Sequence, residues 1–183
     1  QNNEFIIEGL RVVEHSIENS AEIKAIYYTE ELSNDKRGSK LLDRIYNNIS
    51  LYKVSERVLK EISTTDHPKG ILGIVNRKYN ELRDIISKEK FTMIVLDRLQ
   101  DPGNVGTIIR TADSAGVDGI IVLKGTVDIY NSKTIRSTMG SIFTVPVIFI
   151  EETSQIISTL KACGADIIST TLNTEKYHFD VKY

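Results

Sequence analysis

The stretch LDRLQDPGNVGTIIRTA, residues 96–112, decides the fold of this chain of 183 residues. The apolar run 91–96 that leads into it predicts a strand of fully buried character. Pro102 and Gly103 predict a turn at the carboxyl end of that strand, and Asn104 is expected to cap the helix that follows. We expect this helix to run from about residue 105 to residue 115.

An apolar stripe on this predicted helix indicates that it packs against a sheet. The stripe has helical spacing and consists of Val105, Ile108, Ile109 and Ala112. Further strands are expected at 119–123 and 165–170, a β-prone run at 142–150 is interrupted by Pro146, and helices are expected at 131–139 and 153–162. Strands that alternate with helices predict a parallel sheet with helices on its faces, which is an α/β fold.

The amino-terminal half has the same alternation in shorter pieces. The helices expected here are 9–19, a segment around 41–45, and 56–62 with Ser55 as its cap; 34–38 is expected to be a polar turn. Strand-like runs occupy 5–7, 23–28, 51–54 and 71–75. A polar, helix-prone stretch follows, and we set the boundary at about Tyr79. The predicted organisation is a small α/β domain at 1–78, a connector at 79–90 and a second α/β domain at 91–183.

Composition excludes several classes of protein, and it does not by itself identify the class to which this chain belongs. The 23 Lys and Arg against 25 Asp and Glu give a net charge of −2, so the charge alone does not indicate a nucleic-acid partner. Cys163 is the single cysteine, which excludes an intrachain disulfide and a cysteine zinc site. The apolar runs are too short for a membrane span. The sequence begins at Gln1, and we expect an upstream segment to be missing.

Arg110 is the residue of the first stretch with the clearest chemical potential. It is expected on the first turns of a helix, beside the carboxyl end of a strand, where α/β sheets bind ligands. The glycine patterns of dinucleotide folds and of P-loops are absent. Taken alone, an arginine at this position is more often a surface helix residue, and Asn104 is then only a helix cap.

A second polar stretch lies about 30 residues further along the chain, at 131–147. Asn131 is expected to cap a short helix and Gly140 to end it. Lys133 and Arg136 present positive charge suited to phosphate, although a solvated basic helix face explains them as well. Gly125 follows the strand at 119–123 and is expected to line the same crevice.

These two stretches resemble the first two motifs of the SpoU branch of the knotted SPOUT superfamily of RNA 2′-O-ribose methyltransferases. The resemblance implies that Asn104 and Arg110 are catalytic and that Lys133, Arg136 and Ser137 bind substrate. It implies S-adenosylmethionine as cofactor and no metal, with Gly125, Thr170, Thr171 and Leu172 as cofactor-binding candidates. The family's third, glycine-rich motif is not found in this sequence. We therefore expect an incomplete trefoil knot and very weak cofactor binding by these 183 residues.

The amino-terminal stretches EGLRVV, residues 8–13, and TDHPKGILG, residues 65–73, are similar to a small RNA-binding domain fused ahead of SpoU catalytic domains. The resemblance implies that Gly9, Arg11, His67 and Lys69 bind RNA. Lys69 stands where the family often has Gln, so the exact role of that position is open. Structured RNA is commonly recognised through its shape and backbone, which suits glycines and basic side chains.

The reaction that the resemblance implies is methyl transfer from S-adenosylmethionine to a ribose 2′-hydroxyl, with ribosomal RNA favoured over transfer RNA. It also implies a homodimer whose active site lies near the subunit interface, and the single cysteine fits a reducing, cytoplasmic location. Two alternatives are considered. One is a non-catalytic RNA-binding or ribosome-assembly factor of the same fold, and the other is an unrelated α/β enzyme acting on a small molecule.

Overall fold

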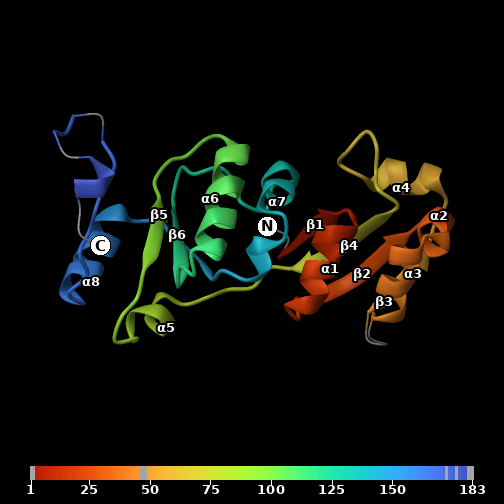
Figure 1. Ribbon diagram of the computed structural model, residues 1–183, viewed down its shortest axis with the longest axis horizontal. Helices are drawn as coiled ribbons and strands as arrows, with labels where there is room; N and C mark the ends of the chain where they lie inside the picture. Colours follow the sequence, from red (N-terminus) through yellow and green to blue (C-terminus); the bar gives the residue numbers. More distant parts are fainter. Residues whose placement is uncertain (1–2, 46–48, 172, 176, 181–183) are drawn as a thin grey trace. The chain divides into compact units, whose positions relative to one another are not determined.

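The computed structural model describes residues 3–45, 49–171, 173–175 and 177–180 (Figure 1). The chain divides into two compact units between Glu151 and Glu152. The first unit contains a four-stranded and a three-stranded sheet. Among the described residues no helix has both the length and the apolar character needed to cross a membrane.

The four-stranded sheet has the order β1-β4-β2-β3. Its strands are β1 (Glu4–Glu8), β2 (Ile23–Tyr28), β3 (Ser50–Lys53) and β4 (Ile71–Asn76). β4 pairs antiparallel with both β1 and β2, whereas β2 and β3 are parallel. This sheet is therefore mixed, and the prediction of a parallel sheet does not apply to it.

Four helices belong to this part of the first unit: α1 (Leu10–Glu18), α2 (Glu30–Asn34), α3 (Lys36–Asp43) and α4 (Glu56–Ile62). The Ser55 hydroxyl accepts a hydrogen bond from the Val58 N–H, so the predicted cap of α4 is confirmed. The polar turn predicted at 34–38 is wrong, because Asp35 caps α3 and Gly38 lies inside that helix. Gly38 is needed there, since a Cβ would come within 2.1 Å of the Leu32 carbonyl oxygen.

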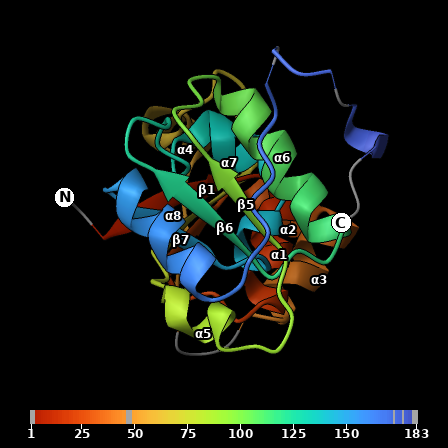
Figure 2. The ribbon, with the colours of Figure 1, turned by 90° about the vertical axis from the view of Figure 1, so that its left-hand side faces the viewer.

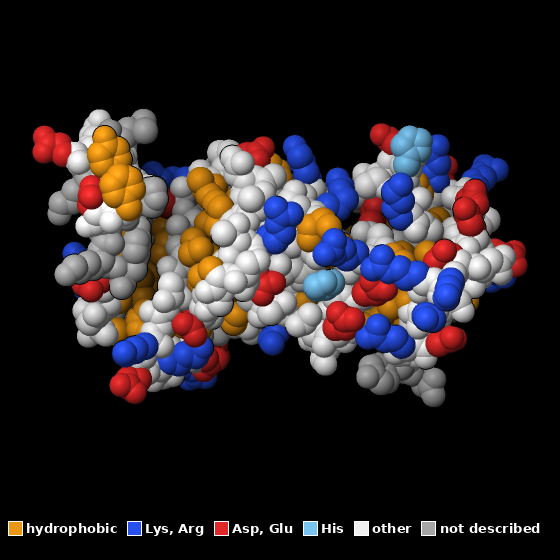
Figure 3. All heavy atoms as spheres, in the orientation of Figure 1, with side chains coloured by type: hydrophobic (Ala, Val, Ile, Leu, Met, Phe, Trp, Pro, Cys, Tyr) orange, Lys and Arg blue, Asp and Glu red, His pale blue; other side chains and the backbone are white. Residues whose placement is uncertain are grey.

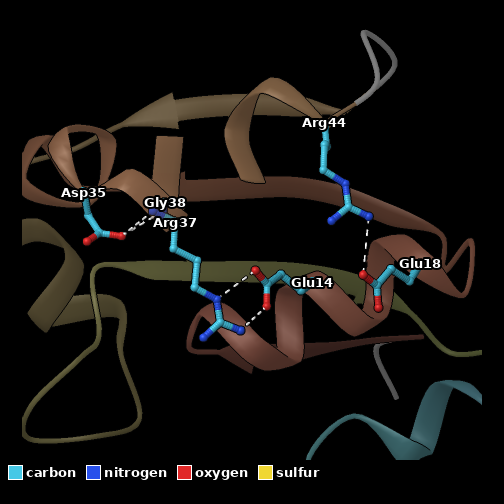
Figure 4. A network of polar contacts seen from close by, with 6 residues as sticks. All are labelled: Glu14, Glu18, Asp35, Arg37, Gly38 and Arg44. Carbon is cyan, nitrogen blue, oxygen red and sulfur yellow. Dashed lines mark hydrogen bonds and ion pairs between the residues drawn. The ribbon is translucent and has the colours of Figure 1, made fainter. Parts of the chain in front are cut away.

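Ion pairs join α3 to α1 across the surface of this sheet (Figure 4). Arg37 pairs with Glu14, and Arg44 pairs with Glu18 at 3.3 Å. The Asp35 carboxylate accepts from the backbone N–H groups of Arg37 and Gly38 at 2.8 and 2.9 Å. Exposed pairs of this kind contribute little stability each, so α3 is held mainly by the burial of Leu41.

The three-stranded sheet is fully parallel, with the order β5-β6-β7 (Figure 2). Its strands are β5 (Met93–Leu96), β6 (Gly119–Leu123) and β7 (Val147–Ile150). Every residue of the central strand β6 is buried. The full burial predicted for β5 is wrong, because β5 is an edge strand on which Val95 is 42% exposed and only Leu96 is buried.

Three α-helices and a 3-10 turn complete the first unit: α5 (Leu82–Ile86), α6 (Pro102–Ser114), α7 (Ser132–Thr138) and the turn at Ser141–Phe143. On α6, Val105, Ile109 and Ala112 are buried and Ile108 partly so, which confirms the stripe. The cap predicted for α6 is wrong. The Asp101 side chain accepts from the Asn104 N–H at 2.7 Å, and α6 begins at Pro102, which needs no N–H partner there.

An aromatic cluster packs between the two sheets of the first unit. The Phe5 ring lies 4.7 Å from the Tyr130 ring and 6.1 Å from the Phe143 ring, measured between centroids. The Arg77 guanidinium lies over the Tyr130 ring at 4.5 Å. Phe5 belongs to β1, whereas Tyr130 and Phe143 flank α7, so this cluster ties the four-stranded sheet to the segment that carries α7.

The second unit contains α8 (Thr153–Ala162), as predicted, and a 3-10 turn at His178–Asp180. The strand predicted at 165–170 is wrong, because this stretch has no regular secondary structure. Ile167 and Ile168 are 45% and 47% exposed. A β-strand needs a neighbouring strand to take its backbone hydrogen bonds, and apolar β-branched residues alone do not supply one.

Candidate functional site

The loop 97–101 follows the carboxyl end of β5, and the loop 124–131 follows the carboxyl end of β6. Hydrogen bonds join these two loops into one surface, which we call the rim. The Val127 N–H donates to the Leu99 carbonyl at 2.8 Å, and the Thr126 hydroxyl donates to the Leu96 carbonyl at 3.1 Å. The Gln100 amide donates to the Gly125 carbonyl. The rim thus forms where ligands approach open parallel sheets.

Gly125 and Arg98 make the closest contact within this rim. Gly125 has φ +94°, and a Cβ there would lie 3.0 Å from the Arg98 Cγ. The Arg98 guanidinium pairs with Asp97 at 2.8 Å and holds the pKa of that carboxyl below its ordinary value. Gly125 is exposed, and no described residue accepts a hydrogen bond from its N–H. A ligand can therefore reach the backbone at this position.

Asn104 and Arg110 lie on the first three turns of α6, and both side chains are exposed. No hydrogen bond or ion pair joins either side chain to the residues that the structure describes. Arg110 follows Gly106 by one helical turn, so the two residues lie on one side of the helix. Because the Asn104 and Arg110 side chains are exposed and have no partner among the described residues, both can contact a ligand.

The contact between α6 and α7 brings the two predicted motifs together. Gly106 is buried, and a Cβ there would lie 2.3 Å from the Ser137 Cβ and 2.8 Å from the Thr134 carbonyl oxygen. The Ser137 hydroxyl itself donates to the Lys133 carbonyl at 3.0 Å. Ser137 is therefore a packing contact of α6, as well as a substrate-binding candidate.

The ends of α7 follow the prediction. The Asn131 side chain accepts from the Lys133 N–H at 2.8 Å, which confirms the cap. The helix ends with Met139 and Gly140 both in left-handed conformations, at φ +54° and +104°. A Cβ at Gly140 would lie 2.6 Å from the Cβ of His15 on α1, so this glycine also allows the amino-terminal segment to approach. No pattern in the sequence links His15 to Gly140.

Arg136 connects α7 to the loop between α4 and β4. Its Nη1 donates to the Thr64 hydroxyl at 3.3 Å. The same loop surrounds the buried carboxylate of Glu8, which accepts hydrogen bonds from Ser63, Thr64 and Thr65. Sequence reasoning missed this network, although Glu8 begins the stretch 8–13 and the polar run 63–65 leads into the stretch 65–73.

The amino-terminal candidates are close in sequence to the residues of this network. Gly9 has φ +92° and caps α1, and its N–H donates to the Ile71 carbonyl at 3.2 Å. Arg11 is exposed on α1, and His67 and Lys69 are exposed on the loop between α4 and β4. On the face drawn in Figure 3, Lys and Arg side chains gather over α7 and over the neighbouring part of the amino-terminal segment.

The cofactor candidates are divided between the two units. Gly125 belongs to the first, whereas Thr170 and Thr171 belong to the second, where both are exposed. Leu172 lies outside the described residues. The described residues contain no group of three or more His, Cys, Asp or Glu side chains arranged to hold a metal ion.

Family models match both parts of the sequence. Residues 92–183 match the SpoU rRNA methylase family, and residues 1–73 match the MRM3-like substrate binding domain. The chain belongs to the SpoU rRNA methylase family. The resemblance of residues 96–112 and 131–147 to SpoU motifs is thereby confirmed at the level of the family.

Relatives of this SpoU protein include characterised enzymes and solved structures. The 23S rRNA (guanosine(2553)-2′-O)-methyltransferase RlmP of Bacillus subtilis is 31% identical over 93% of this chain and 63% of the relative. The AdoMet-bound rRNA methyltransferase of Sinorhizobium meliloti is 36% identical, with a TM-score of 0.72 over 88% of this chain and 59% of the other. AviRb of Streptomyces viridochromogenes, a SpoU methyltransferase solved with AdoMet, is 26% identical, with a TM-score of 0.76 over 87% and 60% of the two chains. The chain thus spans less than two thirds of these relatives.

Proposed function

We propose that this protein transfers a methyl group from S-adenosylmethionine to a ribose 2′-hydroxyl of ribosomal RNA. The observation that carries the proposal is the contact at Gly106, where α6, the helix of Asn104 and Arg110, packs directly against α7, the helix of Lys133 and Arg136. Two polar side chains of α6, which have no partner among the described residues, and two cations of α7 thus share one helix pair. The relatives, which are named as rRNA methyltransferases, support the same reaction.

Arg110 aligns the nucleophile in this proposal. The 2′-hydroxyl must lose its proton as it attacks, but a guanidinium stays protonated and is a poor base. Arg110 therefore contacts the ribose and its phosphate and stabilises the negative charge that develops on the oxygen. Asn104 orients Arg110 or the phosphate. The proton passes to a phosphate oxygen or to a group of a partner subunit.

One feature of the rim supports its assignment to S-adenosylmethionine. Gly125 is exposed, its N–H has no acceptor among the described residues, and as a glycine it has no Cβ to block the approach of a ligand. We assign Gly125 to the cofactor, together with Thr170, Thr171 and Leu172 from the carboxyl-terminal stretch. When bound, the cofactor would supply an electrophilic methyl group on a sulfonium; the ribose oxygen would gain this methyl group and S-adenosylhomocysteine would be the leaving group.

The amino-terminal part binds the RNA in this proposal. We assign residues 1–78 to RNA binding, 79–90 to the connector and 91–183 to catalysis, and the matches of residues 1–73 and 92–183 to separate family models support two functional parts. Gly9, Arg11, His67 and Lys69 contact the RNA backbone, and Lys133, Arg136 and Ser137 contact phosphates near the modified nucleotide. Arginine suits this task because its planar guanidinium can bind a phosphate through two parallel hydrogen bonds.

We further propose that the protein works in the cytoplasm as a homodimer, with the active site near the subunit interface. Because Asn104 and Arg110 are exposed on α6, a second subunit has access to both. Arg136 would then serve the site of the same subunit or that of its partner. Sedimentation of the purified protein tests the dimer, and a monomer at micromolar concentration would contradict it.

The decisive experiment maps 2′-O-methyl groups in ribosomal RNA by mass spectrometry, with and without the gene. We expect one ribose to lose its methyl group in the deletion strain and to regain it when the wild-type gene is restored, but not when Arg110→Ala is. An unchanged methylation map would contradict the proposed reaction. An unchanged map together with a defect in ribosome assembly would favour the non-catalytic alternative.

A further inference from the structure

Glu8 lies at the end of β1 and is only 9% exposed, and its carboxylate has no cationic partner among the described residues. Hydrogen bonds from one short loop stabilise its negative charge instead. Oε1 accepts from the backbone N–H of Thr64 at 2.6 Å and from its hydroxyl at 2.8 Å, and Oε2 accepts from the hydroxyls of Ser63 and Thr65, both at 3.0 Å. Hydrogen bonds to an ionised acceptor are about twice as strong as neutral ones. Glu8 therefore fixes the residues 63–65.

The Thr64 hydroxyl has one hydrogen, and it donates this hydrogen in its hydrogen bond to Glu8. What remains on the oxygen is acceptor capacity alone. Nη1 of Arg136 donates to that oxygen at 3.3 Å. The carboxylate thus orients the hydroxyl so that it presents a lone pair to the guanidinium. Carboxylate, hydroxyl and guanidinium form a directed chain from the four-stranded sheet to α7.

Most of the Arg136 guanidinium remains available after this contact. A guanidinium has five N–H donors, and Thr64 is the one hydrogen-bond acceptor of the Arg136 side chain that the described residues provide. Arg136 is partly buried, which restricts its movement. One bond anchors the planar group, and the other donors remain for a ligand with several acceptor oxygens, such as a phosphate.

We propose that Glu8 and Thr64 are positioning residues that hold Arg136 in place for an RNA phosphate, an inference that rests on the proposed function. Thr64 touches Arg136 directly, and Glu8 acts through Thr64. Because the same loop carries His67 and Lys69, the network also makes the loop and α7 a single phosphate-binding surface. This surface binds the RNA equally in the ground state and the transition state, so its loss raises KM for RNA and leaves kcat nearly unchanged.

The test uses the protein expressed from its complete gene, an unmodified large-subunit rRNA transcript and tritiated S-adenosylmethionine. We expect Thr64→Val, which keeps the shape but removes the hydroxyl, to raise KM for RNA about tenfold with kcat within about twofold. Thr64→Ser should restore most of the affinity, and Glu8→Gln should act like Thr64→Val. Glu4→Gln on the same strand and Thr159→Val on α8 serve as matched controls that leave KM unchanged.

A double-mutant cycle separates positioning from a purely structural role. If Thr64 acts through Arg136, Thr64→Val adds nothing in an Arg136→Ala background, whereas independent losses multiply. Multiplying losses, a kcat effect without a KM effect, or failure of Thr64→Ser to rescue would overturn the proposal. If Thr64→Val lowers the melting temperature, Thr64→Ser, which keeps the hydroxyl, still distinguishes the two roles.

The same variants distinguish this inference from the proposed function. RNA affinity is measured separately, by fluorescence anisotropy with the labelled transcript and without cofactor. A wild type that binds the RNA but transfers no methyl group contradicts the proposed reaction, and the cycle read from the dissociation constants still decides the positioning role. A wild type that neither binds nor methylates the transcript overturns both.

Discussion

Gly106 of α6 and Ser137 of α7 are in such close contact that a Cβ at position 106 would come within 2.3 Å of the Ser137 Cβ. The neighbouring Thr134 carbonyl oxygen, at 2.8 Å from the same point, belongs to the backbone and cannot turn away. The helix of Arg110 and the helix of Arg136 can therefore pack this closely only because position 106 has no side chain.

Gly106→Ala should destabilise the protein although alanine favours helices. The added methyl group must push α7 outward, and overpacking of this kind costs about 1–3 kcal/mol. In a chain of this size that lowers the melting temperature by about 2–4 °C per kcal/mol. Gly103→Ala on the same helix is the control, because its Cβ would meet only the Asp101 side chain, at 3.0 Å. Equal melting temperatures for Gly106→Ala and wild type would show that α7 adjusts freely.

Arg110→Ala should abolish methyl transfer without affecting the fold. The side chain is exposed and bonds to no described residue, so its removal leaves the packing of α6 intact. Loss of one group that stabilises developing charge typically lowers kcat by at least about a hundredfold. Transfer of tritiated methyl to rRNA measures the effect, with cofactor affinity nearly unchanged. The exposed Arg83→Ala on α5 is the control, and turnover retained by Arg110→Ala would remove it from the proposed mechanism.

Local patterns predicted much of the fold. The spacing of Val105, Ile109 and Ala112 identified the buried face of α6, and the caps Ser55 and Asn131 were found from side-chain chemistry alone. These features depend on residues within a few positions of each other. They are therefore visible in a single sequence.

Features that depend on distant residues escaped prediction. Glu8 and Thr64 are 56 positions apart, and His15 of α1 meets Gly140, which lies just beyond α7. One local feature was also mispredicted, namely the cap of α6. Asp101 and Asn104 are both good capping residues, and Pro102 decides between them. The edge position of β5 and the missing strand at 165–170 depend on which strands pair, which composition does not reveal.

Glu8 should make stability depend on pH in the acid range. Its burial raises the pKa, but the hydrogen bonds from Thr64, Ser63 and Thr65 outweigh burial and hold the pKa of Glu8 below its ordinary value of 4.5. A carboxyl with a lowered pKa in the folded state contributes stability above its unfolded pKa, and that stability is lost as the pH falls through the folded value.

Glu8→Gln should therefore be less stable than wild type near neutral pH, and the difference should shrink as the pH falls below about 4.5. Urea unfolding at a series of pH values measures it. The exposed Glu89→Gln is a control that should follow the wild-type curve. A difference between Glu8→Gln and wild type that stays constant down to strongly acid pH would mean that the Glu8 carboxylate charge contributes nothing.

Tyr130 should be among the last of the eight tyrosines to ionise. Burial raises the pKa of Tyr130 to about 12, and the nearby Arg77 guanidinium opposes the shift only in part. An acid whose folded pKa is raised contributes stability below its unfolded pKa, about 10 for tyrosine, and loses it as the pH rises through the folded value. The folded protein should therefore lose stability in alkali as Tyr130 ionises.

Tyr130→Phe tests this shift while keeping the ring contacts to Phe5 and Arg77. Followed by the ultraviolet absorbance of phenolate, the variant should lack a late step near pH 12 that the wild type shows. Its stability near neutral pH should match the wild type, and its loss of stability in alkali should be smaller. Tyr79→Phe, at a position 71% exposed, is the control and should leave the late step in place. If the native protein completes its titration near pH 10, the usual value for tyrosine, the junction between the two sheets is open to hydroxide and the Phe5–Tyr130–Arg77 cluster does not seal it.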